Sequence, residues 1–226
     1  MDNRTPALEM LMACQTACAW SARMVGASLE RSEVDELIAH RDLFDEEPFR
    51  SADATAARRL REICAEAARA EGGPEALWHL TRQDYAYLFY MASASKVFAY
   101  ESVYRTDDAT LCGPTMFDVR ETYRRFGFDP DLSGGIPADH IAVELAFLAA
   151  LFSHAMSVPD EAQAALRAAK AFMDDHVAVF AFTMLDSMRA HARSDWYRAI
   201  ACLIAALATQ VSEALDAWCG GCREQA

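Results

Sequence analysis

GGIPADHIAVELAFLAALF, residues 134–152, joins a glycine–proline turn to a strongly apolar segment. Its large apolar residues recur every three or four positions, which is the spacing of one helical face: Ile141, Leu145, Leu148 and Phe152. The stretch therefore predicts a buried helix over residues 138–155, with Asp139 and His140 at its start. Two interpretations of this polar pair stay open. An acid in the first turn stabilises a helix through its dipole, or the turn presents both side chains to a partner.

The same periodicity recurs along the chain, without internal repeats or the alternation typical of strands. We predict further helices over residues 6–30, 31–43, 54–70, 115–126, 160–191 and 194–217, and an aromatic-rich helix opening at 84–90. Ser51 or Asp53 is a suitable N-cap for the helix of 54–70, and EGGP (71–74) ends that helix. Residues 96–115 predict an extended, ordered loop. The fold class is all-α.

Residues 129–137, DPDLSGGIP, hold two prolines and two glycines and predict a hinge. We expect a single globular helical bundle domain. Its predicted parts are an N-terminal half (1–128), the hinge, a C-terminal half (138–218) and a short Cys/Gly tail (219–226). A hinge of this kind allows a monomer or a domain-swapped dimer.

The charge balance restricts the partners of the chain. Its 226 residues include 34 acidic and 21 basic side chains, for a formal net charge of −13. Such a field repels nucleic acid and anionic membranes and attracts basic segments. The N-terminus is a poor signal peptide, and the apolar run 199–208 is about half of the roughly 20 residues that span a membrane. With seven cysteines and no export signal, we expect a cytoplasmic protein with reduced thiols, no nucleic-acid partner and no membrane insertion.

Three motifs occur in order: Ser102-Val103-Tyr104 after the aromatic helix, Pro137-Ala138-Asp139-His140 before the apolar helix, and Phe172 with His176 further on. Together they resemble the TorD/DmsD/NarJ family of cytoplasmic chaperones for molybdoenzyme maturation, over roughly residues 80–215. The resemblance implies a helical fold without a catalytic centre or cofactor. It also implies a chaperone that binds the twin-arginine leader and body of a molybdopterin-dependent oxidoreductase precursor in the cytoplasm until the cofactor is inserted.

The resemblance also implies which residues bind the peptide: Tyr85, Leu88, Phe89, Tyr100, Ser102, Tyr104, Pro137, Asp139 and His140. The chain departs from the family at Ile136, where an acidic residue is common, and has Tyr at 85 and 100 where some members have Trp. The tyrosines suggest a different cargo.

These residue types suit a leader that carries two arginines before an apolar segment. A guanidinium pairs with a carboxylate and stacks on aromatic faces, so Asp139 beside a tyrosine offers both interactions. The alternative for Tyr85, Leu88 and Phe89 is a place in the core. We expect His140 and Glu144, four residues apart, to be a surface or packing pair rather than metal ligands, because a metal needs more ligands than two.

The C-terminal CGGC, residues 219–222, is the one motif that the resemblance leaves unexplained. A Cys-x-x-Cys pair is redox-active or half of a zinc site in other proteins, so the alternative function is a helical thiol- or metal-binding protein using Cys219 and Cys222. No second pair has suitable spacing, and there is no phosphate-binding loop or hydrolase arrangement. We therefore predict neither a metal nor an enzyme. We also expect His176 to bond within the bundle.

Overall fold

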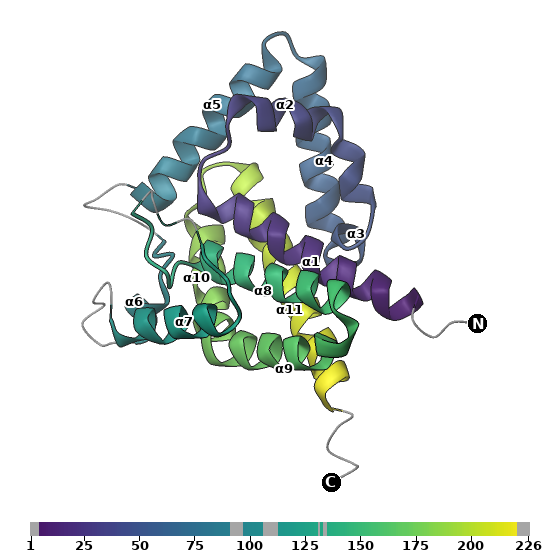
Figure 1. Cartoon of the computed structure of the whole chain (residues 1–226). Coiled ribbons are helices and arrows are strands. Elements are labelled where there is room, and N and C mark those ends of the chain that lie inside the picture. The colour runs from purple at the N-terminus through teal and green to yellow at the C-terminus, as the bar shows by residue number, and fades with distance from the viewer. Residues whose placement is uncertain (1–4, 91–96, 106–112, 131, 133–134, 221–226) are drawn as a thin grey trace. The chain divides into compact units, whose positions relative to one another are not determined.

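The computed structural model describes residues 5–90, 97–105, 113–130, 132 and 135–220. Helices dominate these residues, and the described part of the chain contains no strand, only an isolated antiparallel bridge between Tyr100 and His140. The all-α prediction is confirmed. The chain forms two compact units whose segments are interleaved in the sequence (Figure 1).

The first unit comprises Met1–Arg23, Ala99–Ala181 and Ala208–Ala226, and the second comprises Met24–Phe98 and Phe182–Leu207. Three helices therefore contribute residues to both units: α1 (Thr5–Gly26), α10 (Ala178–His191) and α11 (Asp195–Gly220). The units do not coincide with the N- and C-terminal halves of the sequence. Movement of those halves about residues 129–137 stays a prediction, and Gly134 lies outside the described residues.

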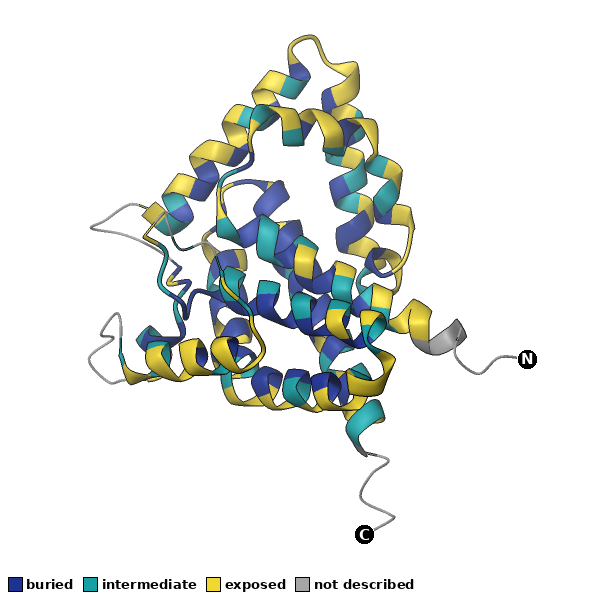
Figure 2. Cartoon of the chain, in the orientation of Figure 1, coloured by how far each residue is buried: buried dark blue, intermediate teal, exposed yellow. Residues whose placement is uncertain are grey.

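Helix α8 (Ile141–Ser157) forms the core of the first unit. Apolar residues occupy most of its positions, so the helix is buried over much of its length rather than along one stripe (Figure 2). The amphipathic helix α9 (Ala162–Phe172) packs along it and continues through a π-helical turn, η4 (Met173–Val177), into α10. The predicted segment 160–191 is thus helical, with the π turn as its interruption.

Helix α7 (Pro114–Arg125) begins with a proline, as the missing N–H of that residue allows. It ends before Gly127, whose φ of +63° suits the C′ position expected of this glycine. Aromatic rings join α7 to α8 and α9, with the Tyr123 ring centroid 4.8 Å from that of Phe147 and 5.9 Å from that of Phe172.

The second unit contains α2 (Arg31–Ala39), the 3₁₀ helix η1 (Arg41–Asp45), α3 (Phe49–Ala52), α4 (Ala54–Arg69) and α5 (Gly73–Tyr85). Asp53 is the N-cap of α4, as one of the two expected candidates, and accepts hydrogen bonds from the amides of Thr55 and Ala56. The EGGP sequence ends α4, but a new helix begins within it. Residues 84–90 therefore close α5 and its π-helical extension η2 (Ala86–Tyr90) rather than opening a helix.

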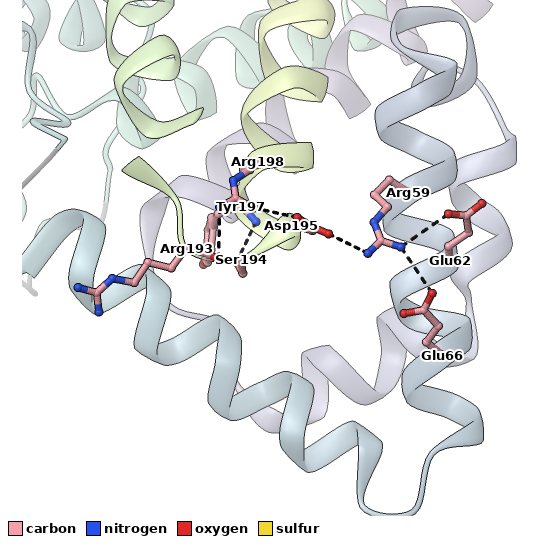
Figure 3. Close-up of polar contacts among 8 residues, drawn as sticks. All are labelled: Arg59, Glu62, Glu66, Arg193, Ser194, Asp195, Tyr197 and Arg198. Carbon is pink, nitrogen blue, oxygen red and sulfur yellow. Dashed lines mark hydrogen bonds and ion pairs between the residues drawn. The ribbon is translucent and has the colours of Figure 1, made fainter. Parts of the chain in front are cut away.

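Polar contacts in the second unit hold the first turn of α11. The Asp84 carboxylate accepts hydrogen bonds from the backbone amides of Arg193 and Ser194, at 3.1 and 2.8 Å. The Arg59 guanidinium, from α4, lies 2.9 Å from the Asp195 carboxylate, which also pairs with Arg198 (Figure 3). Exposed ion pairs contribute at most about 1 kcal/mol each, so the buried Asp84 contributes more to this junction.

One helix of the described chain, Asp195–Cys219, is long and apolar enough to cross a membrane by length and composition alone. Half of its apolar window is buried inside the protein. The predicted helix over 194–217 agrees closely with these bounds, but the membrane test made on the sequence considered only the apolar run 199–208.

Candidate functional site

Two segments of the first unit pair with each other around the predicted binding residues. We call residues 99–105 the strap and residues 137–140 the PADH turn. The amide of Glu101 donates to the carbonyl of Asp139 (2.9 Å), and the amide of Ile141 donates to the carbonyl of Ala99 (2.8 Å). These bonds flank the antiparallel bridge between Tyr100 and His140 and fix the register of the two segments.

The strap ends in a short helix, α6 (Glu101–Arg105). A helix of five residues is too short to show apolar periodicity, so the sequence predicted only a loop here. The Tyr104 ring packs against Phe180, with ring centroids 5.4 Å apart. Arg105 donates hydrogen bonds to the Glu101 carboxylate and to the backbone carbonyl of Asp175 in η4. The strap is thus held at both ends.

Asp139 is fully buried, and its Oδ2 atom accepts a hydrogen bond from the amide of Ser102 at 3.0 Å. Its Oδ1 atom has no hydrogen-bond partner among the described residues. Because α8 begins at Ile141, Asp139 precedes the N-cap and does not cap the helix. Its observed contact is with the strap.

His140 is the N-cap of α8, and its Nδ1 atom accepts a hydrogen bond from the amide of Ala142 at 3.1 Å. Only a neutral imidazole offers that acceptor. Burial lowers the pKa of His140 to about 4, so the ring stays neutral near neutral pH. The Tyr100 ring meets it edge-on, with centroids 5.1 Å apart. Of the two open interpretations, capping holds for His140.

Burial separates the predicted binding residues of this unit. Ser102, Asp139 and His140 are buried, whereas Tyr100, Tyr104 and Pro137 are half-buried and reach solvent. The structure therefore brings the residues together, but the parts that a partner can touch in this conformation are aromatic and apolar. The Asp139 carboxylate is buried beneath this accessible surface.

Two further buried acids adjoin this pairing, Glu101 on the strap and Glu144 on α8. With Asp139 they form what we call the acid cluster. Glu101 has a polar partner at each oxygen: the Arg105 guanidinium lies 2.7 Å from Oε1, and the Nδ1 atom of His176 lies 3.0 Å from Oε2. The expected bond of His176 within the bundle is thus confirmed.

Glu144 differs from Glu101 in the partners of its carboxyl group. It is buried, and no donor among the described residues reaches either of its oxygens. Burial, followed by the charges of Glu101 and Asp139, raises its pKa well above the ordinary value of 4.5. Burial, followed by the acids Glu144, Asp139 and Glu101, raises the pKa of Tyr123, whose hydroxyl donates to the carbonyl of Ala138 at 2.9 Å.

The three predicted residues of the aromatic helix lie in the second unit. Tyr85 and Leu88 are buried there, and the Tyr85 hydroxyl donates to the carbonyl of Val25 at 3.2 Å. Phe89 is half-buried, and its ring centroid lies 4.7 Å from that of Tyr85. Two of the three therefore occupy the core, the alternative that the helical spacing left open.

The model of the family described as nitrate reductase delta subunit matches residues 46–186, more than half of the chain. The chain belongs to this family. The match includes the strap, the PADH turn, α8 and His176. No curated protein matches the chain.

The delta-subunit family consists of chaperones for molybdoenzyme maturation, which act with molybdoenzyme catalytic subunits and are not catalysts. They are cytoplasmic in general. The family suspected from the sequence is therefore confirmed.

The cysteines provide no further site among the residues that the structure describes. Cys14, Cys18 and Cys64 are buried, and burial raises the pKa of Cys64 to about 11, which leaves its thiol protonated. Cys219 is half-buried near the carbonyl of Leu166, and Cys222 lies outside the described residues. No group of three potential metal ligands occurs in the described part.

Sequence reasoning missed Glu101 as a site residue and took Glu144 for half of a surface or packing pair. Both are single acids within apolar or aromatic stretches, AYESVY and IAVELAFL. Such an acid interrupts an otherwise buried pattern, and that interruption is the signal that could have identified them.

Proposed function

We propose that this chain is a chaperone dedicated to one molybdopterin-dependent oxidoreductase. It binds the twin-arginine leader and the body of the precursor in the cytoplasm until the cofactor is inserted. Membership of the delta-subunit family supports the class of client, and the pairing of strap and PADH turn is the observation that carries the proposed leader site.

The accessible side chains of this pairing suit an arginine-containing peptide. A guanidinium stacks on the half-buried rings of Tyr100 and Tyr104, and the apolar side of the leader packs against Pro137. Asp139 and His140 position this surface by holding the strap and capping α8. The Asp139 carboxylate becomes available to an arginine when the strap lifts.

In the second unit, Phe89 is the one of the three predicted residues that reaches solvent, next to the exposed Tyr90. We assign to Phe89 a contact with the apolar segment of the leader, and to Tyr85 and Leu88 the support of that residue from the core. Each buried leucine-sized side chain contributes about 1.5–3 kcal/mol before ordering costs, so a few anchors give a micromolar dissociation constant, about −8 kcal/mol.

The test is a titration of the full chain with a fluorescently labelled leader peptide of the client, followed by anisotropy. We expect a peptide with the twin arginines to bind at least several-fold more tightly than the same peptide with two lysines, since lysine cannot stack or pair bidentately. Equal affinities would rule out arginine recognition. A pull-down that returns no molybdoenzyme subunit would overturn the proposed client class.

A further inference from the structure

The starting observation is the isolation of Glu144 inside the first unit. Its side chain is fully buried on α8, and no N–H or hydroxyl among the described residues donates to either oxygen. An ionised carboxylate in such a place costs several kcal/mol, whereas a neutral carboxylic acid can donate its own proton. The neighbouring acid on the strap is Glu101, which raises the pKa of Glu144, and its carboxylate is the acceptor for that proton in the arrangement inferred below.

The charged and titratable groups around Glu144 come from each packed element. The strap contributes Glu101 and Arg105, the PADH turn contributes Asp139 and His140, α7 contributes Tyr123, and η4 contributes His176. Arg105 is the one cation among them that favours ionisation of Glu144, and it is already paired with Glu101. Lys170, at the end of α9, pairs with Asp174 and Asp216 instead.

From this geometry we infer that Glu144 is the proton-bearing part of a latch: while neutral it holds the strap closed over the acid cluster, and opening of the strap releases its proton. The strap carries both the acceptor of that proton, Glu101, and the amide that binds Asp139. Lifting it therefore removes the partner of Glu144 and admits water to all three carboxyl groups.

The direction of the pH dependence follows from the two states. While the strap is closed, Glu144 keeps its proton well above pH 4.5. When the strap is open and water reaches the carboxyl group, Glu144 titrates near its ordinary pKa. Between these two values the open state binds one proton fewer, so opening becomes up to tenfold more favourable per pH unit. Above the raised pKa the effect ends.

The coupling of the latch to binding rests on the proposed function: a cationic client favours the open state of the strap. An opened acid cluster carries one more negative charge than the closed one, and that charge attracts a guanidinium. Binding of a leader through this cluster releases a proton.

The first test needs no substitution. In the wild-type chain labelled with ¹³C at the glutamate carboxyl groups, we expect the Glu144 resonance to have the shift of a protonated acid at pH 7 while exposed glutamates are ionised. An ionised shift for Glu144 at pH 7 would overturn the latch, whatever the protein binds.

The second test measures opening by amide hydrogen exchange of Glu101, Ser102 and Ile141 between pH 6.5 and 8.5, corrected for the intrinsic exchange rate. We expect the opening constant to rise with pH in the wild type and to be flat in Glu144→Gln, which keeps a donor for Glu101 without a proton to lose. Glu213→Gln, at an exposed position of α11, is the matched control and should follow the wild type. Equal slopes in all three proteins, or exchange of these amides only through global unfolding, would overturn the latch.

The third test separates the latch from the proposed function. Calorimetric titration of the leader peptide in buffers of different ionisation enthalpy counts the protons released on binding. We expect release with the wild type and less with Glu144→Gln. Binding without proton release would overturn the coupling and leave leader recognition standing, whereas no binding at all would reject leader recognition and leave the first two tests to decide the latch.

Discussion

At the residue scale, Asp139 shows how one carboxylate connects two segments. One oxygen accepts the Ser102 amide, and the other has no partner in the described chain. A buried amide that loses its acceptor costs about 1–3 kcal/mol, while removal of a charge from a cluster of acids offsets part of that cost. The two effects can be separated by comparing two substitutions at this position.

We expect Asp139→Asn to unfold at nearly the wild-type urea concentration, because its carbonyl oxygen still accepts the Ser102 amide and the charge is gone. Asp139→Ala should be less stable than Asp139→Asn by about 1–3 kcal/mol, since the amide is left without an acceptor. This exceeds the cost of 1 kcal/mol or less that lost capping would give, because the residue that caps α8 is His140. Identical midpoints for the two variants would show that the hydrogen bond contributes nothing.

At the element scale, the close packing of α4 against α5 depends on Gly73. A Cβ atom added there would lie 2.2 Å from the backbone carbonyl oxygen of Ala67, whereas one added at Gly72 would meet nothing within 4 Å. Gly72 instead has a φ of +65°, which an alanine adopts at a cost of about 1–2 kcal/mol.

We therefore expect Gly73→Ala to destabilise the fold by about 3 kcal/mol or more, which exceeds the cost of Gly72→Ala, because the backbone of one helix must move away from the other. Urea unfolding followed by circular dichroism gives both values. If the Gly73→Ala protein were as stable as the Gly72→Ala protein, α4 and α5 could move apart without a loss in the free energy of unfolding.

How well the elements could be predicted depended on their length and their neighbours. The apolar period placed α8 and α7 within a few residues, and Gly127 marked the end of α7. The EGGP sequence was interpreted only as the end of a helix, although Pro74 also favours the start of one, so α5 was missed except for its last two residues.

The candidate site was predictable only as a set of residues. The family resemblance selected Tyr100, Asp139 and His140, and the structure brings them together. Their burial depends on tertiary packing, which a single sequence does not encode locally. The raised pKa of Glu144 and the core positions of Tyr85 and Leu88 depend on tertiary packing in the same way.

At the scale of the whole molecule, the net charge of −13 acts on every basic ligand. Long-range attraction between opposite charges is screened at a Debye length of about 10 Å in 0.1 M salt. We expect the association rate of the twin-arginine leader, measured by stopped-flow anisotropy, to fall several-fold between about 0.05 and 0.5 M NaCl. A leader with two glutamines in place of the arginines is the control and should respond less; equal slopes for both peptides would exclude electrostatic steering.

Two expectations at this scale stay predictions. Exchange of the C-terminal half between protomers would give a dimer, which size-exclusion chromatography would detect. A zinc ion or a disulfide at Cys219 and Cys222 would be detected by native mass spectrometry. Neither is needed for the chaperone function proposed here.

The bridge between Tyr100 and His140 closes a ring of chain that contains α7. The entropy of such a ring changes slowly with its size, about 0.6 kcal/mol for a doubling of length. A change in the length of this ring is therefore expected to cost little in loop entropy, provided that Tyr100 and His140 keep their register.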